Sequence, residues 1–175
     1  GKTHCMIATG LLAQHPELRK SMLNKKYVDV GVVKVVTISG RENYEYGIWG
    51  SISEQLGQGE LFKEYNTQLK APGENAWVNL LKGQKVLILL DELPPYLDNA
   101  STQVFGQGTL ANMVVYSISS LMSAALELPN CAIVVANLSG SYKAQTKALA
   151  DAISNLQQET RRQAMTITPV QLAGN

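Results

Sequence analysis

A glycine, a lysine and a threonine stand together where the first helix is expected to begin. Gly1-Lys2-Thr3 precedes the mostly apolar stretch Cys5 to Leu12, and the spacing predicts a helix over residues 2–14. The free amides and the positive dipole end of a helix start attract phosphate oxygens. A lysine placed there reaches the β- and γ-phosphates of a nucleotide, and a threonine hydroxyl ligates Mg²⁺. We therefore expect Gly1, Lys2 and Thr3 to form the last part of a phosphate-binding loop, although the sequence does not contain the glycine-rich first half of that motif.

Two acidic residues follow a strongly apolar run in the middle of the chain. The run Val86 to Leu90 predicts a buried strand, which ends in Asp91-Glu92 and is kept from extending by Pro94-Pro95. In an open α/β sheet, ligands bind beyond the carboxyl ends of the strands. Asp91 is therefore expected to hold the magnesium ion, directly or indirectly, and Glu92 to orient or deprotonate the attacking water.

Polar residues also follow two later elements. The run Cys131 to Ala136 predicts another strand, and Asn137 at its tip can hydrogen-bond the attacking water or the γ-phosphate. Arg161 and Arg162 end a predicted helix over 143–160, where a guanidinium can compensate the charge that develops during phosphoryl transfer. Each motif alone is a weak or moderate signal. Their order along the chain is what favours binding and hydrolysis of a nucleoside triphosphate.

Four strands are expected to alternate with helices. The strands are expected over residues 27–38, 86–90, 131–136 and 165–168, and the helices over 2–14, 48–56, parts of 60–82, 110–127 and 143–160. The segments 39–43 and 98–109 have the composition of loops, and a polar connection follows the first helix. Alternation of this kind indicates parallel strands joined by right-handed crossovers. The sequence thus predicts a three-layer α/β fold in which residues 1–175 form a single domain.

Composition and charge exclude several classes of protein. The formal net charge is +1, which predicts no electrostatic grip on nucleic acid or on an anionic membrane, and 45% apolar residues argue against disorder. The longest apolar run, Cys131 to Ala136, is far shorter than the roughly 20 residues of a membrane helix. Two cysteines do not make a disulfide framework. We therefore expect a protein of the cytoplasm that does not enter a membrane.

Four motifs together resemble those of the AAA+ ATPases. They are Gly1-Lys2-Thr3-His4, the run Leu89 to Leu93 with its Asp-Glu pair, the strand-ending Asn137, and Arg161-Arg162 before a strand. Three stretches are more narrowly similar to an uncharacterised family of large predicted AAA+ ATPases of bacteria and archaea: the Gly-Lys-Thr-His start, Ile48 to Gly57, and Leu89 to Tyr96. That family is often encoded beside DNA methyltransferases and helicases in phage-defence loci.

The resemblance implies a role for each matching residue. It implies ATP with Mg²⁺, with Gly1, Lys2, Thr3 and His4 in Walker A and Asp91 and Glu92 in Walker B. Asn137 matches sensor 1, and Arg161 or Arg162 matches the arginine finger that acts on a neighbouring subunit, which implies a homo-oligomer. DNA or DNA-modifying proteins are implied as partners by the resemblance only. Compared with the AAA+ core, the chain lacks the first strand and the C-terminal helical lid, and we interpret it as a segment of a longer protein.

Simpler interpretations compete for several residues. His4 and Cys5 have no partners in the sequence pattern that would complete a metal site, and a first-turn position and a buried thiol explain them better. Tyr44, Tyr46 and Trp49 follow a strand as the pore-loop aromatics of AAA+ motors do, but packing explains them more simply. Solvated charge is the simpler interpretation for a set of basic residues, namely Arg19, Lys20, Lys25, Lys26 and Arg41.

Two other functions are compatible with the same sequence. A nucleotide-dependent switch would bind ATP to control assembly and hydrolyse it slowly or not at all, and Glu92 argues against it. A DNA-binding module with a decayed nucleotide site would need a basic stripe, which the sequence does not offer.

Overall fold

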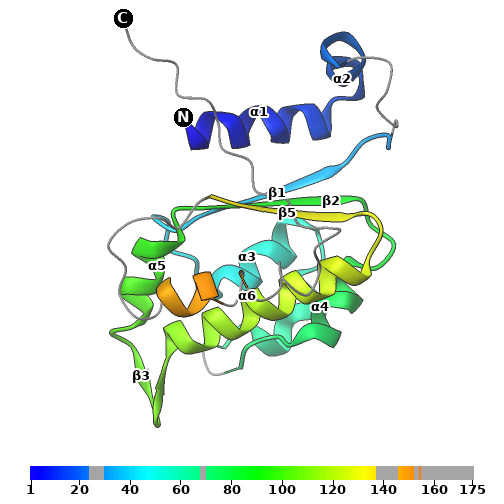
Figure 1. Cartoon of the computed structure of the whole chain (residues 1–175). Helices are drawn as coiled ribbons and strands as arrows, with labels where there is room; N and C mark the ends of the chain where they lie inside the picture. The colour runs from blue at the N-terminus through cyan, green and yellow to red at the C-terminus, as the bar shows by residue number, and fades with distance from the viewer. Residues whose placement is uncertain (24–29, 68–69, 137–145, 152–153, 155–175) are drawn as a thin grey trace, which may run out of the picture.

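A computed structural model describes residues 1–23, 30–67, 70–136, 146–151 and 154. In this part of the chain, three parallel strands form a sheet that helices cover on both faces (Figure 1). The strand order is β1 (Lys34–Ser39), β2 (Val86–Asp91) and β5 (Cys131–Val135), so β2 is central. The predicted α/β class with a parallel sheet is confirmed, and the arrangement is compatible with a Rossmann-like core.

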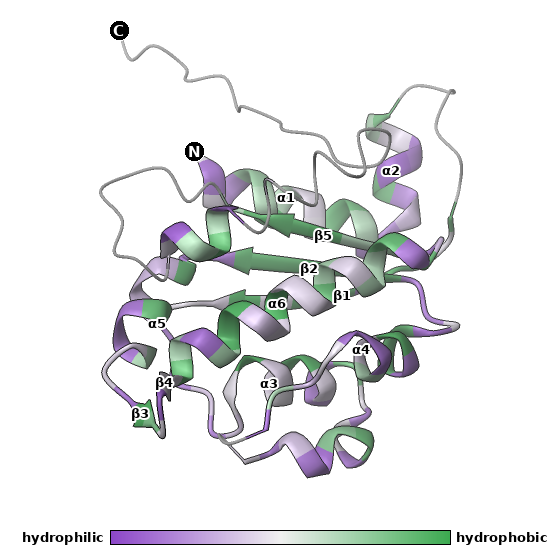
Figure 2. Ribbon diagram, turned by 60° about the horizontal axis from the view of Figure 1, so that its bottom comes forward, coloured by the Kyte–Doolittle hydropathy of each residue, from purple (hydrophilic) through white to green (hydrophobic). Residues whose placement is uncertain are grey.

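One face of the sheet carries the main hydrophobic core. In Figure 1 the helices below the sheet cover this face; they are α3 (Gly47–Gln55), α4 (Glu74–Leu81), α5 (Leu93–Ala100) and α6 (Leu110–Glu127). The 3₁₀ helix η1 (Gly59–Tyr65) adds Phe62, which packs against Trp77 with ring centroids 5.1 Å apart. Trp49 and Trp77 are buried, and the Trp77 indole donates a hydrogen bond of 3.0 Å to Ser117 O. β2 and β5 are green, and so hydrophobic, along most of their length in Figure 2, as expected for strands covered on both faces.

The other face carries α1 (Lys2–Gln14) and α2 (Pro16–Met22) over a much smaller core. The buried residues of this small core are Met6, Leu87 and Leu89. Ile7 and Leu11, which follow the predicted helical spacing, are 56% and 47% exposed. Gly10 is the point of closest approach, because a Cβ there would lie 3.2 Å from Leu89 and 3.4 Å from Val35.

Arg19 of α2 connects the end of α1 with the segment before β1 through hydrogen bonds. Its side chain is only 7% exposed, and it donates to Leu12 O at 2.6 Å and to Ala13 O at 2.7 Å, with a third bond to Gly31 O. These carbonyls belong to the end of α1 and to the segment before β1. The expectation of a solvated charge is therefore wrong for Arg19, because the backbone carbonyls around it replace water.

The outer edge of β1 is closed by a side chain. The Gln55 amide accepts a hydrogen bond from Thr37 N at 3.0 Å and donates one to Thr37 O at 2.9 Å. It thereby pairs with the edge strand as a further strand would, and it protects that edge from unwanted pairing.

Several predicted elements differ from the observed ones. The first predicted strand begins later, at Lys34, and the polar connection after α1 contains α2. Pro94 and Pro95, which were expected only to end the strand, also lie in the first turn of α5. A missing backbone amide costs little at that position. The predicted exposed loop over 98–109 contains the end of α5 and the hairpin β3 (Val104–Phe105) and β4 (Gly108–Thr109). The predicted strand over 165–168 lies outside the described residues, and of the helix over 143–160, residues 146–151 and 154 are described and helical.

Among the described residues, helix α6 is long and apolar enough to cross a membrane by length and composition only, and it packs as part of the core. Of its residues, 44% are buried inside the protein. The helical spacing of apolar residues predicts a stripe of Leu110, Val114, Ile118, Leu121 and Ala125, and all of these except Ala125 are buried. A half-buried helix of this kind is typical of a protein core.

Candidate functional site

The start of α1 and the end of β2 meet above one edge of the sheet. Thr3 Oγ1 donates a hydrogen bond of 2.9 Å to Asp91 Oδ2, although the two residues are 88 positions apart in the sequence. Figure 1 shows why they meet: α1 lies across the sheet with its first turn over the carboxyl ends of the strands. The structure thus brings together the two residues that the sequence analysis assigns to one metal ion.

The backbone around Asp91 holds its carboxylate in place. Oδ1 accepts a hydrogen bond of 2.9 Å from the Glu92 amide, and the Asp91 carbonyl accepts one of 2.9 Å from the Gly40 amide. Ser39 is the register partner of Asp91, so β1 and β2 end side by side. Both strand ends are therefore fixed before any ligand arrives.

Glu92 has the only left-handed backbone among the non-glycine residues that the structure describes, with φ 52° and ψ 37°. Such a conformation is unfavourable for a residue with a Cβ and is found mainly where the surroundings enforce it. Gly40 is part of those surroundings, because a Cβ at residue 40 would lie 1.8 Å from the Glu92 carbonyl oxygen. Only glycine permits the two loops to approach so closely.

The Glu92 carboxylate forms an ion pair with Arg41, with 2.7 Å between Oε2 and Nε. The Arg41 side chain is 71% exposed and that of Glu92 is 37% exposed. Arg41 was expected to be a solvated loop charge; it is indeed exposed, but it is also paired. Since both groups contact solvent, the pair contributes little to stability and opens readily.

The donor set at this edge suits a hard divalent cation. Magnesium prefers oxygen ligands and is commonly bound by one or two carboxylates together with substrate phosphates and water. Thr3 and Asp91 supply a hydroxyl and a carboxylate whose oxygens lie 2.9 Å apart. The described residues contain no group of three or more His, Cys, Asp or Glu side chains that could hold a metal without such help.

The remaining predicted site residues fall into two groups. Gly1, Lys2 and His4 lie at the exposed start of α1 with Thr3. Cys5 is exposed as well, so the expectation of a buried thiol is wrong. Asn137, Arg161 and Arg162 lie outside the described residues. The strand that precedes residue 137 is β5, which pairs with β2 along its whole length.

Sequence reasoning missed Gly40 and Arg41 as neighbours of Glu92. The usable signal was a glycine directly after a strand, at the edge where the acidic pair was already expected. Trp49 behaves as packing predicts, because it is buried and its indole donates a hydrogen bond of 2.7 Å to Tyr65 O. A pore-loop role for Trp49 is therefore wrong.

Comparison with known proteins gives one match. No curated protein and no solved structure matches the chain. The family described as the DUF499 N-terminal domain matches residues 27–167, a range that begins after α1 and α2 and includes all three strands of the sheet. Because this match covers most of the sequence, the chain belongs to the DUF499 N-terminal domain family.

Proposed function

We propose that the protein binds a nucleoside triphosphate, ATP by the family resemblance, together with Mg²⁺ and hydrolyses it at the edge formed by α1 and β2. The observation that carries the proposal is the 2.9 Å hydrogen bond between Thr3 and Asp91. Two residues of the types that bind a nucleotide-bound metal come from distant parts of the chain and touch. If a helix start met a strand end by chance, neither position would need to be a threonine or an aspartate.

Each residue has a distinct role in this proposal. The amides and positive dipole end at the start of α1 attract the phosphates, and Lys2 neutralises the β- and γ-phosphate oxygens. Thr3 and Asp91 hold the metal ion, which when bound neutralises charge on the phosphates. No acidic residue lies in the first turn of α1, so nothing within that turn opposes an anion.

In this proposal Glu92 orients or deprotonates the attacking water, and one of its carboxylate oxygens, Oε2, is paired with Arg41 Nε at 2.7 Å. Opening of the pair frees this oxygen to accept a hydrogen bond from water instead of from the guanidinium. The exposure of both side chains makes this exchange inexpensive.

The same ion pair favours a second candidate function, a nucleotide-dependent switch with little hydrolysis. While Arg41 holds Oε2, the Glu92 carboxylate is less available to water, and the protein would then report nucleotide binding through its conformation. In both cases an arginine from a neighbouring subunit, Arg161 or Arg162, is proposed to complete the site in a homo-oligomer.

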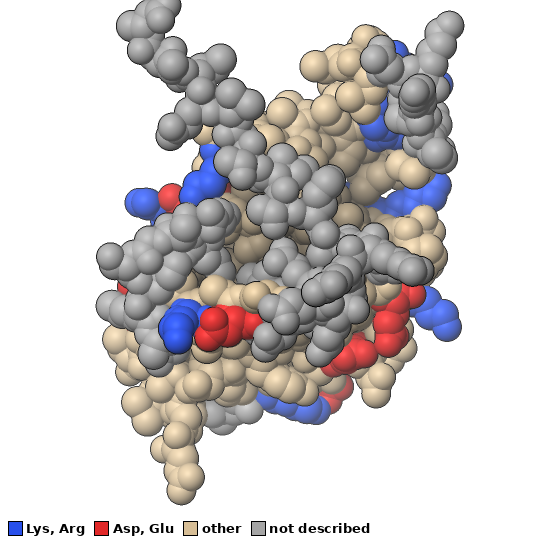
Figure 3. Space-filling model, viewed as in Figure 1, with Lys and Arg blue, Asp and Glu red and all other residues tan. Residues whose placement is uncertain are grey.

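A DNA-related partner is proposed from the family resemblance alone. The described residues on the face in Figure 3 carry charges of both signs without an extended basic stripe.

Nucleotide binding and hydrolysis can be separated by experiment. Binding of a fluorescent ATP analogue with Mg²⁺ is expected for the wild type and at least about tenfold weaker for Lys2→Ala, because a charge-assisted contact is lost. Single-turnover hydrolysis is expected to fall about 100-fold or more in Glu92→Gln, while binding is unchanged. Glu60→Gln, which removes an exposed acidic residue of η1, is the matched control. Equal hydrolysis rates in wild type and Glu92→Gln would dismiss hydrolysis by Glu92 and favour the switch.

A further inference from the structure

A polar pocket lies beside the candidate site, between the loop after β1, helix α5 and the base of the β3–β4 hairpin. Its volume is about 480 Å³. Six polar or aromatic side chains from these three segments line it: Asn43, Tyr44, Glu45, Tyr96, Asn99 and Gln103. No role in nucleotide binding has been assigned to any of them.

The two tyrosines form rigid walls of the pocket. The Tyr44 hydroxyl accepts a hydrogen bond of 2.8 Å from Ser39 N and donates one of 3.0 Å to Ser39 O. The Tyr96 hydroxyl lies near the backbone of Ile48, and the two ring centroids are 6.4 Å apart. Burial raises the pKa of both hydroxyls, so both rings stay uncharged at neutral pH. Because the Tyr44 hydroxyl is already occupied, that ring offers a ligand only its face and edges.

The hydrogen-bonding capacity of the pocket comes from amides instead. The side chains of Asn43, Asn99 and Gln103 form no hydrogen bond with any other described residue. Each amide can both donate and accept. A ligand that carries N–H and C=O groups close together, as a peptide backbone does, matches them.

The charge at the pocket is negative. Glu45 lines it and interacts with the Tyr46 hydroxyl, and Glu42 precedes Asn43 in the same loop. Within the described residues neither carboxylate forms an ion pair, whereas the nearby Arg41 is paired with Glu92. Phosphate groups would be repelled here, and a cationic group would be attracted.

We infer that this pocket binds an extended polypeptide segment through a basic side chain, Arg or Lys, with the amides holding the peptide backbone. The alkyl stem packs against the tyrosine rings, the charged end meets Glu45, and a cation near a tyrosine face gains further attraction. The inference goes beyond the proposed function, since peptide binding of this kind needs no nucleotide. The pocket and the Glu92–Arg41 pair share the loop after β1 and helix α5, so a bound segment contacts both elements that hold that pair.

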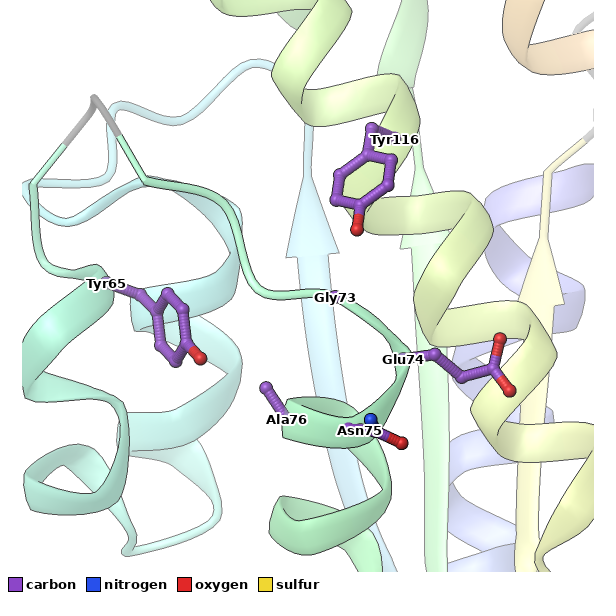
Figure 4. A pocket seen from close by; sticks show the side chains of 6 residues that line it. All are labelled: Tyr65, Gly73, Glu74, Asn75, Ala76 and Tyr116. Carbon is purple, nitrogen blue, oxygen red and sulfur yellow. The ribbon is translucent and has the colours of Figure 1, made fainter.

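A second cavity provides matched controls. It has a volume of about 470 Å³ at the start of α4 and is lined by similar residue types, including Tyr65, Glu74, Asn75 and Tyr116 (Figure 4). Figure 4 shows the Glu74 side chain extended away from Tyr65, so the carboxylate and that ring do not enclose one ligand. Substitutions there change the same residue types without touching the proposed peptide site.

The test measures binding of four labelled heptapeptides that differ only in the central residue, Arg, Lys, Gln or Glu, by fluorescence anisotropy without nucleotide. The Arg and Lys peptides are expected to bind at least about tenfold more tightly than the Glu peptide. Glu45→Gln is expected to weaken the Arg peptide by about tenfold, and Asn99→Ala by about threefold or more. Glu74→Gln and Asn75→Ala are expected to bind as the wild type does.

Several results would overturn the inference. They are the absence of binding by both basic peptides, equal binding of the Glu peptide, or equal losses in the control variants. A twelve-nucleotide single-stranded DNA is added as a competitor of the Arg peptide. If it displaces the peptide, and does so more strongly in Glu45→Gln, the pocket is a nucleic-acid site instead. Circular dichroism of each variant shows whether a lost signal reflects unfolding. Because nucleotide is absent, failure here leaves the proposed hydrolysis untouched, and failure of hydrolysis leaves this test valid.

Discussion

The two faces of the sheet differ sharply in how they are packed. The face under α3, α4 and α6 buries two tryptophans and Phe62 in one continuous core. The face under α1 buries Met6, Leu87 and Leu89 and leaves Ile7 and Leu11 exposed. The face under α3, α4 and α6, called the thicker face, buries most of the apolar side chains that stabilise the fold. The face under α1, called the thinner face, positions Thr3 at the end of β2. The position of the candidate site therefore depends on the weaker half of the packing.

Stability is expected to fall most when the core under α3, α4 and α6 is disrupted. Trp77→Ala should lower the free energy of unfolding by about 3–5 kcal/mol, because it leaves a large cavity and removes the indole hydrogen bond to Ser117. Urea denaturation followed by circular dichroism measures this loss. A loss below about 1 kcal/mol would contradict the difference between the two faces, since it would mean that this core contributes little to stability.

A smaller loss of stability, but a direct effect on hydrolysis, is expected from a substitution where β1 and β2 end. Gly40→Ala places a Cβ 1.8 Å from the Glu92 carbonyl, so the backbone must move, at a cost of about 3 kcal/mol. Hydrolysis should fall with stability because Glu92 is displaced. Gly59→Ala is the control, since its added Cβ would meet only the Glu54 side chain at 3.5 Å. Unchanged hydrolysis in Gly40→Ala would show that the left-handed Glu92 is not needed.

The thinner face can be loosened selectively. Arg19→Met removes three hydrogen bonds to backbone carbonyls and should cost about 2 kcal/mol. Amide hydrogen exchange should increase in α1 and α2, while β2 and α6 keep their protection. Equal loss of protection on both faces would mean that the two faces unfold as one unit, contrary to the comparison.

The smallest effect on stability is expected at the exposed ion pair. Arg41→Ala should change the free energy of unfolding by less than about 1 kcal/mol, because both partners contact solvent. Single-turnover hydrolysis should rise, since the Glu92 carboxylate is released toward water. A fall in hydrolysis would assign Arg41 a supporting role instead of a restraining one.

Local pattern predicted the elements better than their contacts. The apolar runs that became β2 and β5 and the stripe of α6 specify strand and helix through period and burial, and these predictions are confirmed. Helix α5 was missed because Pro94 and Pro95 disrupt a helix interior but are accepted in a first turn.

Long-range contacts were only partly predictable. The meeting of Thr3 and Asp91 followed from the order of motifs and from the rule that ligands bind at the carboxyl ends of strands. The contacts of Gly40 and Arg41 with Glu92 depend on how two loops pack, and short-range periodicity carries no information about that. The buried Arg19 was missed for the same reason, since its carbonyl partners are set by the fold.

The most direct test of a shared metal–nucleotide site is a double-mutant cycle on Thr3→Ala and Asp91→Asn, with the affinity for a fluorescent ATP analogue measured in Mg²⁺ and in EDTA. Each single variant should lose most of the Mg²⁺-dependent part of the affinity, and the double variant should lose no more than the stronger single one, because both residues act through one ion. In EDTA the four proteins should bind alike. Additive losses that persist in EDTA, or a wild type that does not bind the analogue, would contradict the account.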